Sequence, residues 1–397
     1  MNFYVITLIK LGLVMAVFMT TLAYLQWVER KVLAHIQLRL GPYRVGPHGL
    51  LQPLADVIKL LTKEGFVPKN VNLFFYLLAP FLAVTIALTA IAVIPFGPVI
   101  EIAGVTTAMQ MTDVPMGILF VLALSSVGVY GVALAGWASN NKYALLGGLR
   151  SSAQMISYEL PMALALAAPL LMINTLSLRE MVEKQSAFYF GFLPSWTIFQ
   201  APFPQVISFF IFLIAAFAET NRIPFDLPEA ENELVAGFHT EYSSMNFAAF
   251  FMAEYANMIT VTAIATLLFL GGWHPIWPVE LGSWIVPVAL FVGAGVISIF
   301  HGMQPARPFD RITLPVAGVA FIGIGLLFAI PMLQPYLLPI FWFTAKTGAL
   351  LFVFIWVRGT LPRFRYDQLM SFAWKFMFPV ALVNLLLTAL AVTLTTN

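Results

Sequence analysis

The chain has 397 residues, of which 60% are hydrophobic and only 10% are charged. Soluble globular chains carry about a quarter charged residues, so this composition is typical of a helical protein that crosses the membrane several times. The net charge of +2 does not favour nucleic acid as a partner, and without cysteine the chain has no disulfide, thiolate metal site or cysteine-bound iron–sulfur cluster. Haem ligation by histidine is harder to exclude, but the five histidines form no obvious facing pair.

The first predicted element is a membrane span over residues 3–28, which is apolar except for Lys10. It has no basic leading segment and no small-residue cleavage site, so we expect a retained span and not a signal peptide. Residues 29–70 are more polar and contain a Gly- and Pro-rich turn at 41–49. Residues 50–63 have an apolar stripe opposite a charged face, but they are shorter than the ~20 residues that cross a membrane. They predict an amphipathic helix that lies in the cytoplasmic interface or packs on a partner protein.

Ten apolar runs are candidate spans of a ~30 Å hydrocarbon core. They cover residues 3–28, 73–95, 114–137, 153–173, 204–219, 246–270, 283–300, 312–333, 340–357 and 377–395. The sequence therefore predicts an all-α, polytopic transmembrane bundle of about ten spans, which forms a single integral membrane domain over residues 1–397.

The distribution of lysine and arginine predicts the orientation of these spans. Sixteen of the 20 lie in alternate connecting segments, namely 29–72, 138–152, 220–245, 301–311 and 358–376. Connecting segments rich in these residues stay on the cytoplasmic side. We therefore expect the N-terminus outside and these five segments inside.

An acidic stretch separates the fifth and sixth predicted spans. Residues 218–242 hold one cation, Arg222, and six acids: Glu219, Asp226, Glu229, Glu231, Glu233 and Glu241. One interpretation is a charged loop that only connects two spans. The other is a carboxylate cluster held against the apolar residues between the acids, where desolvation and mutual repulsion raise pKa values and let protons be held and released near neutral pH.

Three acids fall within or at the end of predicted spans: Glu159 in the fourth, Glu219 at the end of the fifth and Glu254 in the sixth. Ionisable groups in the membrane are costly and mark functional sites by default. The alternative is a neutral acid that is hydrogen-bonded to a neighbouring helix. A spaced series of carboxylates joined by water is what a proton path needs, so we favour that role.

A basic group follows the ninth predicted span and contains Arg358, Arg363, Arg365 and Lys375. For Arg358 and Lys375 we expect ordinary flanking of a span on the cytoplasmic side. In PRFRYDQ, however, Arg363, Arg365 and Asp367 alternate with aromatic residues, which favours a packed, hydrogen-bonded junction. We expect a packed, hydrogen-bonded junction also at Arg39 and Arg44, beside the Gly-Pro turn.

Four long motifs resemble the H subunit of bacterial NADH–quinone oxidoreductase, respiratory complex I, which is the counterpart of the mitochondrial ND-one protein. They are ERKVLAHIQLRLGPYRVGPHGLLQPLADVIKLLTKE, GGLRSSAQMISYELPM, AETNRIPFDLPEAENELVAGFHTEYSSMNFAAFFMAEYANM and WVRGTLPRFRYDQLM. The resemblance extends over about 1–275 and 335–397. It implies a membrane protein, without redox centres of its own, that forms much of the quinone chamber and holds an acidic path linking quinone reduction to proton pumping.

The resemblance also implies which residues carry these roles. The acidic proton path falls on Glu159, Glu219, Asp226, Glu229, Glu231, Glu233, Glu241 and Glu254. The quinone chamber and junction fall on Glu29, Arg30, Arg39, Arg222, Phe225, Arg363, Arg365 and Asp367. No metal or bound cofactor is implied; quinone is a substrate shared with neighbouring subunits. The implied partners are membrane-arm and peripheral-arm subunits, including an iron–sulfur protein at the cytoplasmic face, and the implied location is the cell inner membrane.

The sequence departs from the family over residues 276–334, where two extra spans are predicted in place of a short outer loop. We also expect the apolar stripe of 50–63 to face inward and line the entrance for the quinone tail. Two alternatives stay open. One is the equivalent component of a membrane-bound hydrogenase or ferredoxin-linked complex. The other is a stand-alone ion or proton transporter, which would not explain why acids and basic loops gather on one face.

Overall fold

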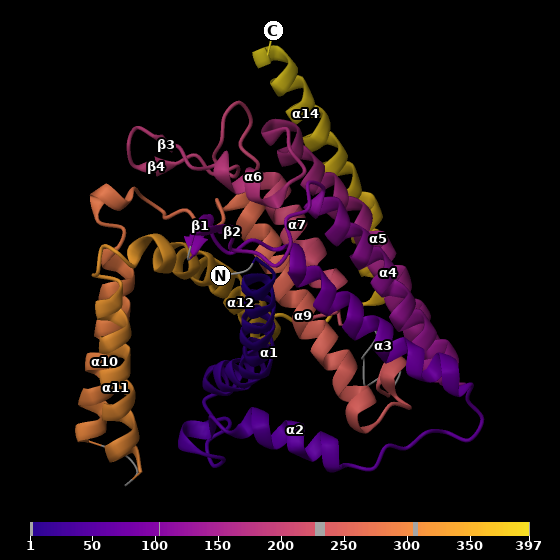
Figure 1. The fold of residues 1–397 in the computed structure, drawn as a ribbon. Helices are drawn as coiled ribbons and strands as arrows, with labels where there is room; N and C mark the ends of the chain where they lie inside the picture. Colours follow the sequence, from indigo (N-terminus) through magenta and orange to yellow (C-terminus); the bar gives the residue numbers. More distant parts are fainter. Residues whose placement is uncertain (1–2, 103, 227–234, 305–308, 397) are drawn as a thin grey trace.

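The computed structural model describes residues 3–102, 104–226, 235–304 and 309–396, and it confirms a polytopic helical bundle (Figure 1). The long helices are α1 (Phe3–Ile36), α3 (Leu73–Ala90), α4 (Gly117–Ala138), α5 (Lys142–Ile173), α7 (Val206–Glu219), α9 (Ser244–Phe269), α10 (Ile285–Met303), α11 (Asp310–Leu327), α12 (Gln334–Thr360) and α14 (Phe378–Thr396). The short helices are α2 (Gln52–Thr62), α6 (Leu178–Glu183) and α13 (Tyr366–Phe372), and a π-helical turn, Ala373–Met377, joins α13 to α14. Four 3-10 turns are Pro47–Gly49, Ile91–Val93, Gly237–His239 and Val279–Leu281.

Each of the ten predicted spans corresponds to a helix. In the part of the chain that the structure describes, nine helical segments are long and apolar enough to cross a membrane. The tenth, α7, is apolar but has only 14 residues, fewer than the ~20 that a full crossing needs. Helix α5 begins at Lys142, before the predicted start at residue 153, because Asn141 caps its first turn by accepting a hydrogen bond from the backbone of Tyr143.

Helix α9 forms the centre of the bundle, and α3, α7 and α12 pack around it (Figure 1). In its most apolar window 61% of the residues are buried, against 17% for α1. Helices α4 and α5 approach closely through glycine: a Cβ added to Gly136 would lie 2.6 Å from the carbonyl oxygen of Ala144. Small residues at such crossings let helices pack in the membrane, where no hydrophobic effect drives them together.

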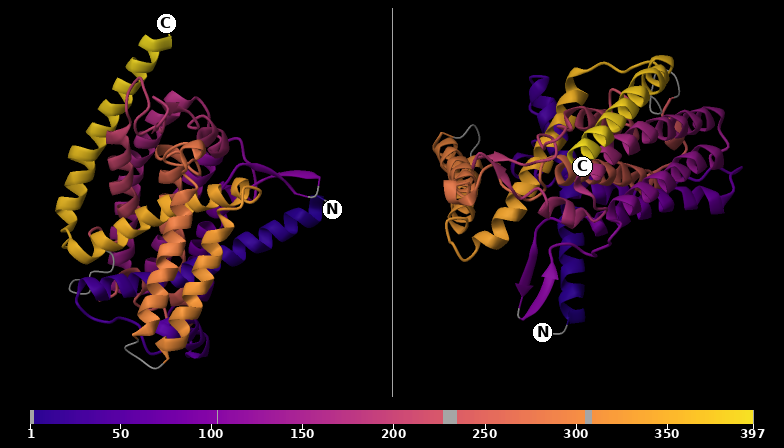
Figure 2. Two further views of the ribbon diagram at one scale, coloured as in Figure 1. Left: turned by 90° about the vertical axis from the view of Figure 1, so that its left-hand side faces the viewer. Right: turned by 90° about the horizontal axis from the view of Figure 1, so that it is seen from above.

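Helices α10 and α11 form a hairpin that stands apart from the bundle (Figures 1 and 2). At one end it packs on α12 through an apolar cluster that includes Phe328, Leu338 and Trp342. At the other end Asp310, the first residue of α11, contacts the Gly-Pro turn: its carboxylate lies 3.2 Å from Nε2 of His48. Both helices are apolar and long enough to span. That residues 276–334 are an insertion in a single membrane domain stays a prediction.

The five segments predicted to lie inside meet at one end of the molecule. Contacts between them are Asn140 with Asn70, Asn141 with Glu241, Ser243 with Phe66, Phe364 with Pro224, and His48 with Asp310. These contacts support the alternating topology. That this end faces the cytoplasm stays a prediction.

Helix α2 forms as predicted and runs across that end of the bundle (Figure 1), but its orientation corrects one expectation. The apolar stripe faces outward: Leu54, Ile58 and Leu61 are more than half exposed. Asp56 of the charged face turns toward α1, where it pairs with Arg30 at 2.7 Å, whereas Lys59 and Lys63 are exposed. The expectation that this stripe faces inward is therefore wrong for the chain alone, and a quinone entrance at residues 50–63 stays a prediction. The stripe is free to contact membrane or another protein.

Two small antiparallel hairpins were not expected from the sequence. Strand β1 (Val99–Ile102) pairs with β2 (Val105–Ala108), and β3 (Phe188–Tyr189) pairs with β4 (Leu193–Pro194). The first hairpin gives Lys10 its partners, since Nζ of Lys10 donates to Oγ1 of Thr107 at 3.0 Å. The one charge of the first span is thus satisfied at the end opposite α2.

Candidate functional site

A buried cluster of ion pairs centres on Arg222, which follows the C-terminus of α7. Asn221 adopts a left-handed backbone conformation (φ 49°), and the side chain of Arg222 is only 5% exposed. Its Nε lies 2.6 Å from Oε1 of Glu254 on α9, and its Nη1 lies 3.2 Å from Oε1 of Glu29 on α1. The guanidinium also lies over the ring of Tyr255, 4.3 Å from its centroid. One arginine thus joins α1, α7 and α9.

Two more arginines complete the cluster. Arg358 on α12 pairs with Glu29, so the prediction of simple flanking is wrong for this residue. Arg363 lies 3.1 Å from Oδ2 of Asp226. Among the described residues, three acids thus pair with three arginines, of which Arg222 is buried and Arg363 is 40% exposed. Lys375 is exposed, as flanking predicts.

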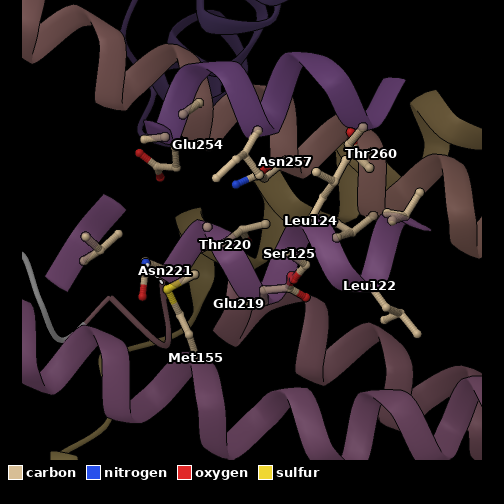
Figure 3. Close-up of a pocket in the computed structure, with 18 of the residues that line it drawn as sticks. Leu122, Leu124, Ser125, Met155, Glu219, Thr220, Asn221, Glu254, Asn257 and Thr260 are labelled. Carbon is tan, nitrogen blue, oxygen red and sulfur yellow. Dashed lines mark hydrogen bonds between the residues drawn. The ribbon is translucent and has the colours of Figure 1, made fainter. Parts of the chain in front are cut away.

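The second part of the site is a cavity of about 90 Å³ between α3, α4, α5, α7 and α9 (Figure 3). Glu219, Glu254 and Asn257 are among its polar lining residues, with Thr220, Asn221, His239 and Thr260. One oxygen of Glu219 accepts a hydrogen bond from Ser125. The other, Oε2, is buried and has no protein partner among the described residues. The volume accommodates two or three waters at ~30 Å³ each; most of the lining is apolar, and the acids, amides and hydroxyls give such waters their hydrogen-bond partners.

Glu159 lies on α5 outside the lining of this cavity, and it accepts a hydrogen bond from Ser126. Ser126 is exposed and Glu159 is half-buried, so this pair lies at the lateral surface of the bundle. The acids of the predicted path thus extend from the ion-pair cluster at Glu254, through the cavity at Glu219, to the edge at Glu159.

The remaining predicted path residues are not in the cavity. Glu241 accepts a hydrogen bond from Asn141 at 2.6 Å and lines a separate surface pocket with Lys69 and Lys142. Asp226 belongs to the ion-pair cluster. Glu229, Glu231 and Glu233 lie outside the described residues.

Among the predicted junction residues, Glu29, Arg222 and Arg363 are brought together, whereas others lie elsewhere. Arg30 pairs with Asp56, and Arg39 donates to Gln37 at 2.9 Å. Arg365 and Asp367 pair with each other at 3.2 Å and are 77% and 65% exposed. These exposed charges lie on the same end of the molecule as the cluster.

Phe225 lies in the wall of a second, larger cavity of about 610 Å³ between α7, α12 and α13. Its ring contacts that of Phe364, with centroids 5.7 Å apart. Gln368 is the one polar side chain among those that line this cavity in the described structure. The site therefore combines an apolar cavity, a balanced ion-pair cluster and a carboxylate cavity.

Sequence reasoning missed several residues that hold this site together. Gln154 on α5 is fully buried and donates to the carbonyl oxygens of Ala218 and Phe225, at 2.8 and 2.7 Å. It thereby fixes both ends of the segment that carries Arg222. The available signal was a polar residue within a membrane helix, and Ser125 and Ser126 in the otherwise apolar α4 carry the same signal more clearly.

Fold and site together define a multi-spanning membrane protein whose buried charges gather at one end and continue into a carboxylate cavity. A family model described as NADH dehydrogenase matches residues 9–389. The chain is 68% identical over 396 residues to the first NADH-quinone oxidoreductase H subunit of Solibacter usitatus (strain Ellin6076), covering 100% of this chain and 99% of that protein. It is 48% identical to the second H subunit of Koribacter versatilis (strain Ellin345), covering 99% and 98%. The chain belongs to the family of NADH-quinone oxidoreductase H subunits.

This membership confirms the resemblance found in the sequence. The chain is a membrane component of complex I, and so part of an enzyme complex whose other subunits are its partners. Membership of this family favours a component of complex I over a hydrogenase component or a stand-alone transporter. Because the Solibacter relative aligns along the whole chain, residues 276–334 are not peculiar to this sequence.

Proposed function

We propose that this chain forms much of the quinone chamber of the complex and holds the acidic path that links quinone reduction to proton pumping. The observation that carries the proposal is the position of Glu254. It pairs with Arg222 in the ion-pair cluster and also lines the cavity that contains Glu219. A change of charge in the ion-pair cluster therefore changes the electrostatic potential in the cavity, because Glu254 belongs to both.

The quinone headgroup is reduced next to the ion-pair cluster, and the apolar cavity beside Phe225 contributes to the chamber wall. Reduction takes two electrons from an iron–sulfur protein of the complex and two protons. Charge that develops there competes with Glu254 for Arg222, because the guanidinium already bridges two carboxylates. When Arg222 moves its interaction away from Glu254, that carboxylate accepts a proton more readily.

The change in protonation of Glu254 is then relayed by proton transfer through waters in the cavity to Glu219, and from there to Glu159 at the lateral surface. Each acid can change its protonation state because, among the described residues, neither Glu219 nor Glu159 pairs with a fixed cation. A neighbouring membrane-arm protein continues the path at that surface. The iron–sulfur protein docks on the end that presents Arg39, Arg365 and Asp367, where exposed charges orient a partner. The complex resides in the cell inner membrane.

The test replaces Glu159, Glu219 and Glu254 one at a time by Gln. Glutamine keeps shape and hydrogen bonding but carries no proton, so the complex should assemble while pumping coupled to quinone reduction falls sharply. Complex content is measured on native gels, and proton uptake in membranes. Glu183→Gln, a half-exposed acid that pairs with Arg179 at the opposite end, is the matched control. Full activity and pumping in all three variants would show that these acids are structural.

A further inference from the structure

Two adjacent serines in the middle of α4 each donate a hydrogen bond to a carboxylate from a different helix. Ser125 donates to Glu219, at the end of α7, and Ser126 donates to Glu159, on α5. Consecutive residues of a helix point about 100° apart, so the pair serves the acids on two sides of α4. One short element therefore touches two acids of the proposed path.

Ser125 donates a hydrogen bond to the buried carboxylate of Glu219. In the part of the chain that the structure describes, it is the one side chain that donates to Glu219, which lines the cavity and whose second oxygen is buried without a protein partner (Figure 3). The other titratable groups on the cavity wall are Glu254 and His239, and Glu159 lies across α4. A hydrogen bond donated to a carboxylate favours its ionised form. Ser125 also holds the carboxylate of Glu219 at the wall of the cavity.

Ser126 differs because it has a second acceptor. Its hydroxyl lies 3.1 Å from the carbonyl oxygen of Leu122, one turn earlier in α4. When Glu159 is ionised, the serine hydrogen goes to the carboxylate. When Glu159 is protonated, the carboxyl hydrogen goes to Oγ of Ser126, and the serine hydrogen goes to Leu122. In both protonation states of Glu159, the hydroxyl of Ser126 thus has an acceptor and stays hydrogen-bonded to the carboxyl group. Ser125 has no such second acceptor among the described residues.

We propose that Ser125 and Ser126 are positioning residues of the proton path, with Ser125 favouring the ionised form of Glu219 and Ser126 allowing Glu159 to alternate between its two forms. This inference rests on the proposed function of the acids. It assigns the two sites different tasks: Ser125 offsets part of the cost of ionising the buried carboxylate of Glu219, and Ser126 lets Glu159 accept and release a proton without a change of packing.

The test compares Ser125→Ala and Ser126→Ala in the complete complex, with NADH-driven quinone reduction and proton uptake measured across a pH series. Hydrogen bonds to charged groups are strong enough that Ser125→Ala should lower coupled turnover about tenfold to a hundredfold at neutral pH. Its pH profile should move to higher pH, because the ionised form has lost its donor. Ser125→Thr keeps the hydroxyl and should restore the wild-type profile. Ser126→Ala should lower proton uptake per quinone reduced.

Ser152→Ala is the matched control, since among the described residues this buried serine donates only to a carbonyl of its own helix, that of Gly148 at 2.8 Å. It should leave the pH profile unchanged. In a Glu219→Gln background, Ser125→Ala should cause no further change, because the carboxylate that it acts on is gone. A wild-type profile in Ser125→Ala, an equal shift in Ser152→Ala, or an undiminished effect in the Glu219→Gln background would each overturn the inference. Full pumping in Glu219→Gln itself would instead overturn the proposed function.

Discussion

Replacement of Arg222 by Met tests the ion-pair cluster most directly. The variant keeps much of the apolar stem but removes the charge that bridges Glu254 and Glu29. Glu29 retains Arg358 as a partner. Glu254 loses the cation at 2.6 Å, and its side chain is only 18% exposed.

Removing one partner of a buried ion pair costs about 3–5 kcal/mol, because the remaining charge is left without compensation. Partial exposure of Glu254 places the expected cost near the lower end, about 3 kcal/mol, which is more than a hundredfold in an equilibrium constant. We therefore expect much less assembled complex on native gels and little quinone reductase activity. Arg222→Lys should recover only part of this loss, because an ammonium does not bridge two carboxylates as a guanidinium does.

The double variant Arg222→Met, Glu254→Gln provides the decisive comparison. It also removes the carboxylate that lost its partner at 2.6 Å, so assembly should recover while pumping stays absent. The control is Arg179→Met, which removes an arginine that pairs with Asp113 and Glu183, both at least 40% exposed. Each of these two exposed ion pairs stabilises the protein by about 1 kcal/mol at most. Normal assembly of Arg222→Met, or no recovery in the double variant, would refute the electrostatic reasoning.

Two further predictions concern the ends of the molecule. Because the chain has no cysteine, a Gln304→Cys variant carries a single thiol at the exposed end of α10, and an impermeant thiol reagent should modify it only from the cytoplasmic side; modification from outside would contradict the predicted topology of α10 and α11. His274 lies beyond the end of α9, where burial and the nearby Lys346 ammonium lower its pKa to about 4. Its folded-state pKa is thus below the unfolded value of 6.5, so stability is constant above pH 6.5 and falls as the pH drops toward 4, by about 2 kcal/mol at pH 5. Thermal unfolding of the complex should show this loss, and His274→Gln should reduce it; an unchanged pH dependence in that variant would show that another group is responsible.

The sequence by itself determined the class of fold and most of its elements. Hydropathy is a local property, so runs of apolar residues located the ten long helices of the described structure, including α10 and α11. The short amphipathic segment around Leu54 also formed the helix that its period predicts. The alternation of basic segments grouped the five connecting segments that meet at one end.

Tertiary structure alone decided which charges meet. Arg358 looks like an ordinary flanking residue in the sequence, and only the packing of α12 against α1 brings it to Glu29. The pairing of Asp56 with Arg30 likewise turned the apolar stripe of α2 outward. The physical reason is that hydropathy depends on neighbours along the chain, whereas an ion pair or a serine–carboxylate hydrogen bond depends on how helices distant in sequence are rotated and packed against each other.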